Sequence, residues 1–135
     1  MDELASGQCL CGVVTFQISG EFESFFLCHC MRCRKDSGSA HAANLFSSTA
    51  KIVWLSGVEN IREFRLAGSQ HVKCFCTNCG SGLPFNLADD AALVVPAGSL
   101  DTPIALLPNA HIYYASRAAW DNDLGSLDII EGRPG

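Results

Sequence analysis

The chain has 135 residues, is 48% hydrophobic and carries a formal net charge of −5, with nine lysines and arginines against fourteen aspartates and glutamates. This length predicts a single domain over residues 1–135, and the shortage of basic residues argues against a nucleic-acid-binding surface. The polar start MDELASGQ predicts no secretory signal, and no segment approaches the ~20 apolar residues of a membrane span. We therefore expect a cytoplasmic protein that does not bind membranes.

Short segments of alternating apolar and polar residues, separated by turn residues, dominate the chain. Those that predict β-strands are 13–19, 51–56, 61–67, 71–76, 91–98 and 111–116. The segment MRCRKDSG predicts one or two helical turns that end at Gly38, and Asp89 and Asp90 are expected in a solvated turn. Because no long helical pattern occurs, the sequence predicts a mainly all-β fold of coiled antiparallel sheet.

Cysteine is the most unusual feature of the composition, with eight residues. Two clusters share one spacing, CHCMRC at 28–33 and CFCTNC at 74–79, and the other two cysteines stand in GQCLCG. A chain of this length can bury an ordinary core and does not need disulfides to fold. In a reducing compartment, cysteines in such number indicate metal ligands or redox groups.

Four of the thiols have the spacing of a closed tetrahedral zinc site, which we call the cage. Cys9 and Cys11 are expected to share one face of a strand, while Cys76 and Cys79 form a knuckle turn followed by Gly80. Sulfurs bound to one zinc ion at ~2.3 Å lie a little under ~4 Å apart, which side chains leaning inward can reach. The cage therefore predicts a structural zinc.

The other cluster predicts an open site, which we call the triad. Cys28 and Cys30 are expected on one face of a strand, and the following turn returns Cys33 to the same point. Three protein ligands with an open fourth position are typical of catalytic zinc. The triad therefore predicts a second zinc site, whose occupancy the sequence leaves open.

The sequence leaves alternatives open for two residues beside these ligands and for the identity of the metal. Cys74 shares a strand face with Cys76 and is either a further ligand or a small buried apolar residue. His29, between two ligands, should face the other side and pack or form a hydrogen bond in the core. Four thiolates can also hold an iron–sulfur cluster, and a disulfide scaffold is a further alternative, although the knuckle turns favour zinc.

Other polar and aromatic residues are candidates for a site or for the core. His41 is either a plain strand residue or a base or hydrogen-bonding partner near the triad, and the same two interpretations hold for His111. Phe85 and Trp120 are expected in the core or in a pocket wall. The basic run RCRK at 32–35 is either a solvated turn or a rim that binds a substrate carboxylate.

Zinc held by three thiolates is formally anionic, which makes it a weaker Lewis acid than zinc held by three histidines. Such a centre is less suited to activating water than to binding an incoming thiol, which loses its proton on coordination and stays nucleophilic. The chemistry that we predict is the attack of a substrate thiolate on a carbonyl or another small electrophile.

The chain resembles the glutathione-dependent formaldehyde-activating enzyme (Gfa) family, which includes centromere protein V. The stretches that carry the resemblance are GQCLCGVVTF, CHCMRCRKDSGSA, CFCTNCGSGL, AGSLD and HIYYASRAAW. It implies a small zinc-binding β-fold shared with accessory proteins of Rab GTPases, a structural zinc in the cage and a catalytic zinc in the triad. It also implies condensation of glutathione with formaldehyde to S-(hydroxymethyl)glutathione, an activity classed as a carbon–sulfur lyase.

Three functions therefore compete. The first is a zinc-dependent carbon–sulfur lyase-like enzyme that acts on a thiol such as glutathione and a small aldehyde-like electrophile. The second is a non-catalytic zinc-binding module for a protein partner, and the third is a metal or redox sensor whose triad releases zinc on oxidation. The sequence favours the first and keeps the other two as alternatives, and it predicts neither the true substrate nor the oligomeric state.

Overall fold

The computed structural model describes residues 4–87 and 91–135, so the predicted turn at Asp89 and Asp90 lies outside the described residues. Strands predominate, and one short helix, α1 (Met31–Ser37), accompanies them. The strands are β1 (Leu4–Gln8), β2 (Thr15–Ser19), β3 (Ser24–Cys28), β4 (Ala42–Ser47), β5 (Lys51–Ser56), β6 (Ile61–Arg65), β7 (Val72–Cys76), β8 (Phe85–Asn86), β9 (Leu93–Pro96) and β10 (Ala110–Ile112). Short 3₁₀ turns are η1 (Val58–Asn60), η3 (Ala97–Ser99), η4 (Tyr114–Ser116) and η5 (Leu124–Ser126).

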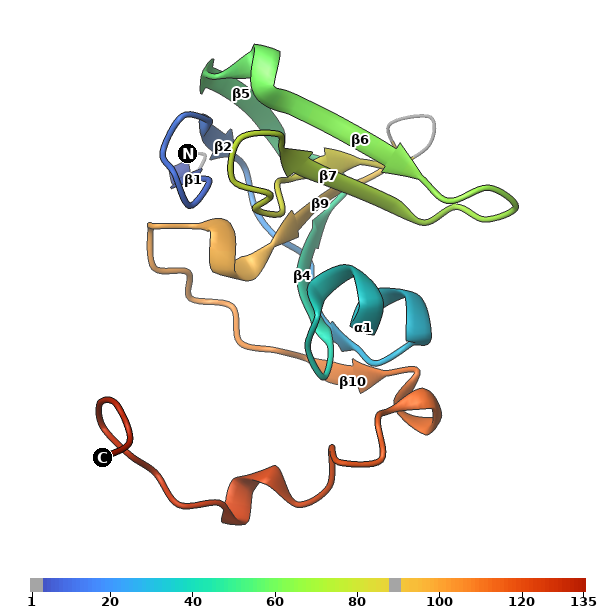
Figure 1. The fold of residues 1–135 in the computed structure, drawn as a ribbon. Coiled ribbons are helices and arrows are strands. Elements are labelled where there is room, and N and C mark those ends of the chain that lie inside the picture. Colours follow the sequence, from blue (N-terminus) through green and yellow to red (C-terminus); the bar gives the residue numbers. More distant parts are fainter. Residues whose placement is uncertain (1–3, 88–90) are drawn as a thin grey trace.

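The strands form three small sheets, as Figure 1 shows. Their strand orders are β1-β2-β5, β10-β3-β4-β9-β8 and β6-β7. Every pair within them is antiparallel except β10 with β3, which run parallel. The predicted class, a small and mainly β domain of antiparallel sheets, is confirmed.

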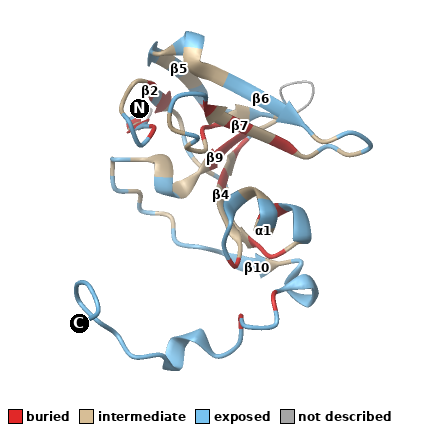
Figure 2. Ribbon diagram, in the orientation of Figure 1, coloured by how far each residue is buried: buried red, intermediate tan, exposed pale blue. Residues whose placement is uncertain are grey.

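The core lies between the sheets and consists of residues that alternate along the strands (Figure 2). In β2, Phe16 and Ile18 are buried while Gln17 between them is exposed. The same alternation buries Val72, together with two cysteines, in β7. The alternating pattern in the sequence therefore identified these faces correctly.

Four strands lie outside the segments predicted as strands: β1, β3, β4 and β8. The sequence of β1, LASGQ, has little intrinsic strand preference. It is held by pairing with β2, where Gly7 stands opposite Phe16. A Cβ atom at Gly7 would lie 2.6 Å from the Phe16 ring and would also clash with the Ser99 carbonyl oxygen. Close packing, rather than propensity, fixes this strand.

The predicted strand 111–116 is too long. The strand β10 ends at Ile112 because Tyr113 adopts a left-handed backbone with φ of 53°, after which η4 begins. Beyond β10 the chain is mostly exposed (Figure 2), apart from Ala118 and Asp121, which are buried. Trp120 in this segment is 62% exposed, so its predicted place in the core or a pocket wall is wrong. None of the described helices is both long and apolar enough to span a bilayer.

Candidate metal centres

The four cage thiols come together from two turns that are far apart in sequence. Cys9 and Cys11 lie in the turn between β1 and β2, and Cys76 and Cys79 lie at the end of β7 and in the turn after it. Their sulfur atoms all lie within 4.8 Å of one another, and those of Cys9 and Cys11 are 3.6 Å apart. This spacing suits one tetrahedral ion with thiolate ligands.

The two turns of the cage are built alike. Each closes on a glycine in the left-handed conformation, with φ of 81° at Gly12 and 80° at Gly80. The amide of Gly12 donates to the carbonyl of Cys9, and that of Gly80 donates to the carbonyl of Cys76. Cys9 and Cys11 therefore belong to a turn, and the prediction that they share a strand face is wrong. Gly12 makes this turn possible, because a side chain there would be strained.

Hydrogen-bond donors surround the cage sulfurs. The amide of Val14 donates to Cys9 Sγ over 3.3 Å, and Asn78 Nδ2 donates to Cys11 Sγ over 3.2 Å. Ser81 Oγ lies 3.2 Å from Cys79 Sγ, and the Ser81 hydroxyl and amide lower the pKa of Cys79 to about 5. Donors of this kind favour thiolates, the form in which cysteine binds metals.

The triad is built at the junction of β3 and α1. Cys28 ends β3, Cys30 is the N-cap of α1, and Cys33 lies in the first turn of that helix. Cys30 Sγ accepts a hydrogen bond from the Cys33 amide over 3.3 Å. The three sulfur atoms lie within 4.8 Å of one another, so the predicted grouping is present, although only Cys28 is in a strand.

Burial is the main influence on the pKa of two of the three triad thiols. Burial raises the pKa of Cys28 and, more strongly, that of Cys33. Burial also acts to raise the pKa of Cys30, but hydrogen bonds led by the Cys33 amide outweigh it and lower that pKa. A cation that draws three thiolates together would offset the cost of burying them.

Both clusters fit a thiophilic metal, and they differ in ligand number. Among the described residues, no further His, Cys, Asp or Glu joins either group within the same distance. Cys74 therefore stands apart from both clusters, and the alternative that makes it a ligand finds no support in this geometry. It is buried, and this burial raises its pKa to about 12, so that its thiol is inert at neutral pH.

A groove of about 810 Å³ is lined by residues of both clusters. Its lining includes Cys9 of the cage and Cys33 of the triad, and also Phe85, which was predicted in the core or in a pocket wall. A volume of this size lies within the range of small-molecule sites, roughly 300–1,000 Å³. One thiol of the triad, that of the buried Cys33, therefore borders a space of this size.

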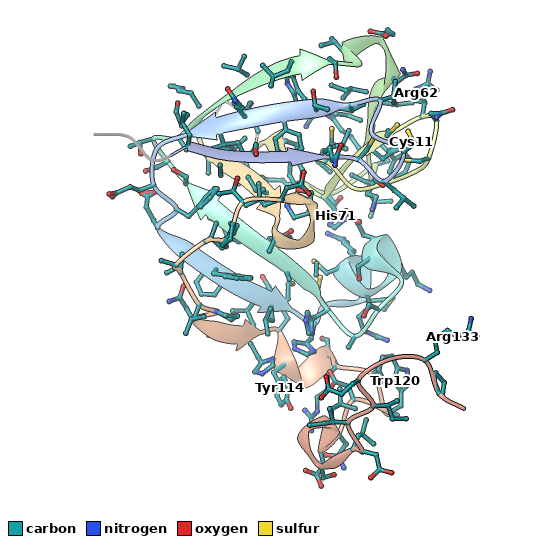
Figure 3. The ribbon with its side chains drawn as sticks, turned by 90° about the vertical axis from the view of Figure 1, so that its left-hand side faces the viewer. Cys11, Arg62, His71, Tyr114, Trp120 and Arg133 are labelled. Atoms are coloured by element: carbon teal, nitrogen blue, oxygen red, sulfur yellow. The ribbon has the colours of Figure 1, made fainter. Side chains whose placement is uncertain are left out.

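One wall of this groove carries a charged network that sequence analysis missed. Asp36 of α1 lies 2.7 Å from His71 Nε2 and 2.8 Å from Lys73 Nζ, and all three residues line the groove. His71 appears midway along the molecule in Figure 3. The pairing joins α1 to β7 and places both signs of charge beside the space that Cys33 borders.

Three histidines gather beside the triad loop, and one of them, His41, also lines the groove. His29 Nε2 lies 2.8 Å from His111 Nδ1, and the ring centroids of His29 and His41 are 5.1 Å apart. His29 is only 1% exposed, as predicted for a core residue that forms a hydrogen bond. Burial, followed by the two neighbouring imidazoles, lowers the pKa of His41. Asp121, 2.9 Å from His29 Nδ1, completes the cluster and was not predicted.

Comparison with known proteins identifies the fold and the family. The model of the family described as "Glutathione-dependent formaldehyde-activating enzyme" matches residues 4–116. A crystal structure of a Rhodobacter sphaeroides protein from a structural genomics programme has a TM-score of 0.54 at 22% sequence identity, covering 74% of this chain and 91% of that chain. No curated protein matches the sequence. With the family match covering most of the chain and both cysteine clusters, the protein belongs to the glutathione-dependent formaldehyde-activating enzyme family.

Proposed function

We propose that the protein is a zinc-dependent carbon–sulfur lyase-like enzyme that joins a small thiol of the glutathione type to a small aldehyde such as formaldehyde. Cys28, Cys30 and Cys33 would hold the catalytic zinc, and the cage would hold a structural one. The observation that carries the proposal is the pair of unequal clusters in a member of this family. One group has four thiols and the other has three, among the residues that the structure describes.

The reaction forms one bond between sulfur and carbon. The substrate thiol loses its proton, its sulfur attacks the carbonyl carbon, and the carbonyl oxygen takes up a proton, so that RSH and H₂CO give RSCH₂OH. A zinc ion in the triad would supply a position that favours the deprotonated form of the thiol. The chain itself contributes the groove that Cys33 borders.

The groove supports a substrate of mixed charge. Its wall carries Asp36, His71 and Lys73, and the basic side chains of Arg32 and Lys35 lie on α1 nearby in sequence. A peptide-like thiol carries carboxylates and an ammonium group, which can pair with charges of both signs. His41 also lines the groove, and its lowered pKa keeps it neutral near pH 7, so that it can accept a proton.

An interaction module is the second candidate, and the C-terminal segment favours it. Leu127, Ile129 and Ile130 are all exposed, Ile129 to 88%, in a row that the described part of this chain does not cover. Exposed apolar residues in sequence often mark protein contacts. The groove at the triad is not required by this function, whereas the enzyme needs it.

Exchange-resolved NMR of formaldehyde and glutathione tests the enzymatic proposal. We expect micromolar zinc-loaded protein to accelerate exchange between free glutathione and S-(hydroxymethyl)glutathione. The protein with Cys30→Ser serves as the control for non-specific thiol effects. Equal exchange rates with and without the wild-type protein would rule out this substrate pair.

A further inference from the structure

His29 stands between two thiols of the triad and is held by residues from the far end of the chain. Its neighbours in sequence are Cys28 and Cys30, and its own side chain is almost completely buried. Within residues 4–87 and 91–135, each polar contact of His29 beyond its own loop is made with the segment from β10 to Asp121. Figure 3 shows this segment, with Tyr114 and Trp120 labelled, at the end of the molecule opposite Cys11.

The backbone of the triad loop is the first point of contact. β10 runs parallel to β3, with Ile112 paired to Cys28, and the Ile112 carbonyl accepts a hydrogen bond of 2.9 Å from the His29 amide. This is the one parallel pair among the described strands. The last strand of the chain therefore fixes the backbone at the residue between two ligands.

The imidazole of His29 is the second point of contact, and both ring nitrogens are engaged. Nε2 and His111 Nδ1 share a hydrogen bond of 2.8 Å. Nδ1 lies 2.9 Å from Asp121 Oδ2, although the two groups are not aligned as a regular hydrogen bond. The ring of Tyr114 packs edge-on against the imidazole with a centroid distance of 5.0 Å. His29 is thus enclosed from three directions.

The segment is shaped to return to His29. Tyr113 holds a left-handed backbone, which costs an ordinary residue about 1–2 kcal/mol, and this turns the chain back after β10. The amide of Asp121 donates to the Ala118 carbonyl over 3.0 Å, which closes the turn that presents the carboxylate. Asp121 is buried, whereas each residue after it is exposed. The contact with the triad loop therefore ends at Asp121.

Fixing the side chain of His29 also fixes the two sulfurs beside it. In an extended Cys-His-Cys stretch the outer side chains point to one side and the middle one to the other. Rotation of the backbone at His29 therefore changes the separation of the Cys28 and Cys30 sulfurs. Partners behind a metal's own ligands hold those ligands in the productive arrangement, and losing such a partner typically lowers metal affinity by roughly 10- to 100-fold.

We propose that His29, clamped by His111 and Asp121, is a positioning residue that holds the Cys28 and Cys30 sulfurs at the spacing a metal ion needs. The C-terminal segment 110–121 thereby controls metal affinity at the triad and leaves the cage unaffected. Asp121 belongs to this device although it lies beyond residues 4–116, the part that matches the family. The inference rests on the proposed function only in requiring that the triad binds a metal.

Metal competition on the full chain tests this proposal. Zinc is titrated against a chromogenic chelator, and cobalt is used in parallel because thiolate-to-cobalt absorption reports each site. Cys33→Ser identifies which binding phase belongs to the triad. Asp121→Ala removes the carboxylate, Asp121→Asn keeps an acceptor oxygen of the same shape, and His111→Ala removes the partner at the other ring nitrogen. Asp123→Ala, an exposed acidic residue two positions further on, is the matched control.

We expect Asp121→Ala to lower the metal affinity of the triad phase at least tenfold, and Asp121→Asn to lower it less. His111→Ala should also lower it. The cage phase should stay unchanged in each variant, which also shows that the protein is folded, and Asp123→Ala should behave as the wild type. Two intact phases in Asp121→Ala, or equal weakening of both, would overturn the positioning role. A wild-type protein that binds only one equivalent would overturn the proposed function together with it.

Discussion

The cage and the triad use the same ligand type but differ in what surrounds it. The cage joins two turns from different sheets, each closed by a glycine, and hydrogen-bond donors face its sulfurs. The triad is local to one loop and the first turn of α1, and its support comes from histidines behind it. From this difference we expect that a metal in the cage would hold the fold together, and that the triad could lose its metal without unfolding the chain.

Loss of a cage ligand should have the largest effect. Cys76→Ser removes a sulfur from the end of β7, and we expect the chain to lose cooperative folding together with both metals. The metal contributes roughly 10–16 kcal/mol in small structural zinc sites, which equals or exceeds the whole stability of a typical domain. Thermal unfolding followed by circular dichroism measures this effect.

A matched control lies two residues away in the same strand. Cys74→Ala also removes a buried thiol, but one that belongs to neither cluster. It should cost about 1 kcal/mol through the small cavity it leaves, and the protein should keep both metals. If Cys76→Ser melted as cooperatively as Cys74→Ala, the cage would not have the structural role assigned to it.

Loss of a triad ligand should abolish activity and spare the fold. Cys30 is the N-cap of α1, and serine is one of the preferred residues at that position, so Cys30→Ser should leave the helix intact. We expect one metal equivalent in place of two, an unfolding transition close to that of the wild type, and no acceleration of thiol–aldehyde exchange. Retained exchange activity in this variant would separate the reaction from the triad.

The sequence predicts the triad and each half of the cage because the spacing within each of them is local. Cys28, Cys30 and Cys33 meet within one loop, and the turn from Cys76 to Gly80 follows directly from its glycine. At Cys9 the sequence predicts a strand where the chain forms a turn. The Cys-x-Cys spacing is compatible with both, and the left-handed backbone of Gly12 decides for the turn. The alternation of apolar and polar residues predicted the fold class. The strand β1 could not be predicted in this way, because it depends on close packing of Gly7 against Phe16.

The supports behind the triad could not be predicted in the same way. His29 and His111 are 82 positions apart, and Asp36 and His71 are 35 positions apart, so only the folded chain brings them together. The sequence does mark His41 and His111 as candidates near a site. It offers no reason to select Asp121 from the acidic residues of the C-terminal segment, because its burial depends on the left-handed turn at Tyr113.

Acid should separate the two sites in a fixed order. A metal ion competes with protons for thiolates. A thiol with a raised pKa is protonated at neutral pH and already weakens metal binding there. A thiol with a lowered pKa weakens metal binding only when the pH falls below that pKa. In the triad, burial raises the pKa of Cys28 and Cys33, and only the pKa of Cys30 is lowered. In the cage, burial raises the pKa of Cys76, but hydrogen bonds led by the Val14 amide outweigh burial and lower that of Cys9, and Ser81 lowers that of Cys79 to about 5. As the pH falls, the triad should therefore release its metal first.

Metal release during an acid titration from about pH 8 to about pH 4, a range that spans the loss of thiolate ligands to protons, measures this order. A metal-responsive dye should report two steps in the wild type, and the step at higher pH should be missing in Cys30→Ser. The loss of circular dichroism should accompany only the step at lower pH. Release of both metals in one step would mean that the two clusters are coupled and share one stability.

The smallest of the predicted effects should come from replacing the glycine that follows each cluster. Gly80 after the cage and Gly38 after α1 both have positive φ, 80° and 65°, and a Cβ atom at either position would have no neighbouring atom within 4 Å. Alanine at either site should therefore lower the free energy of unfolding only by the strain of a left-handed backbone, about 1–2 kcal/mol. Denaturant unfolding of Gly80→Ala and Gly38→Ala should show losses of similar size.

Metal affinity then distinguishes the two glycines. The Gly80 amide donates to the Cys76 carbonyl and so shapes the cage turn itself, whereas the Gly38 amide donates to the Arg34 carbonyl, beyond the triad ligands. Gly80→Ala should weaken metal binding at the cage, and Gly38→Ala should leave the triad phase almost unchanged. Asparagine tolerates this backbone better than alanine, so Gly80→Asn should recover part of both losses. If Gly80→Asn stayed as weak as Gly80→Ala, the missing free energy would have to come from something other than the left-handed turn.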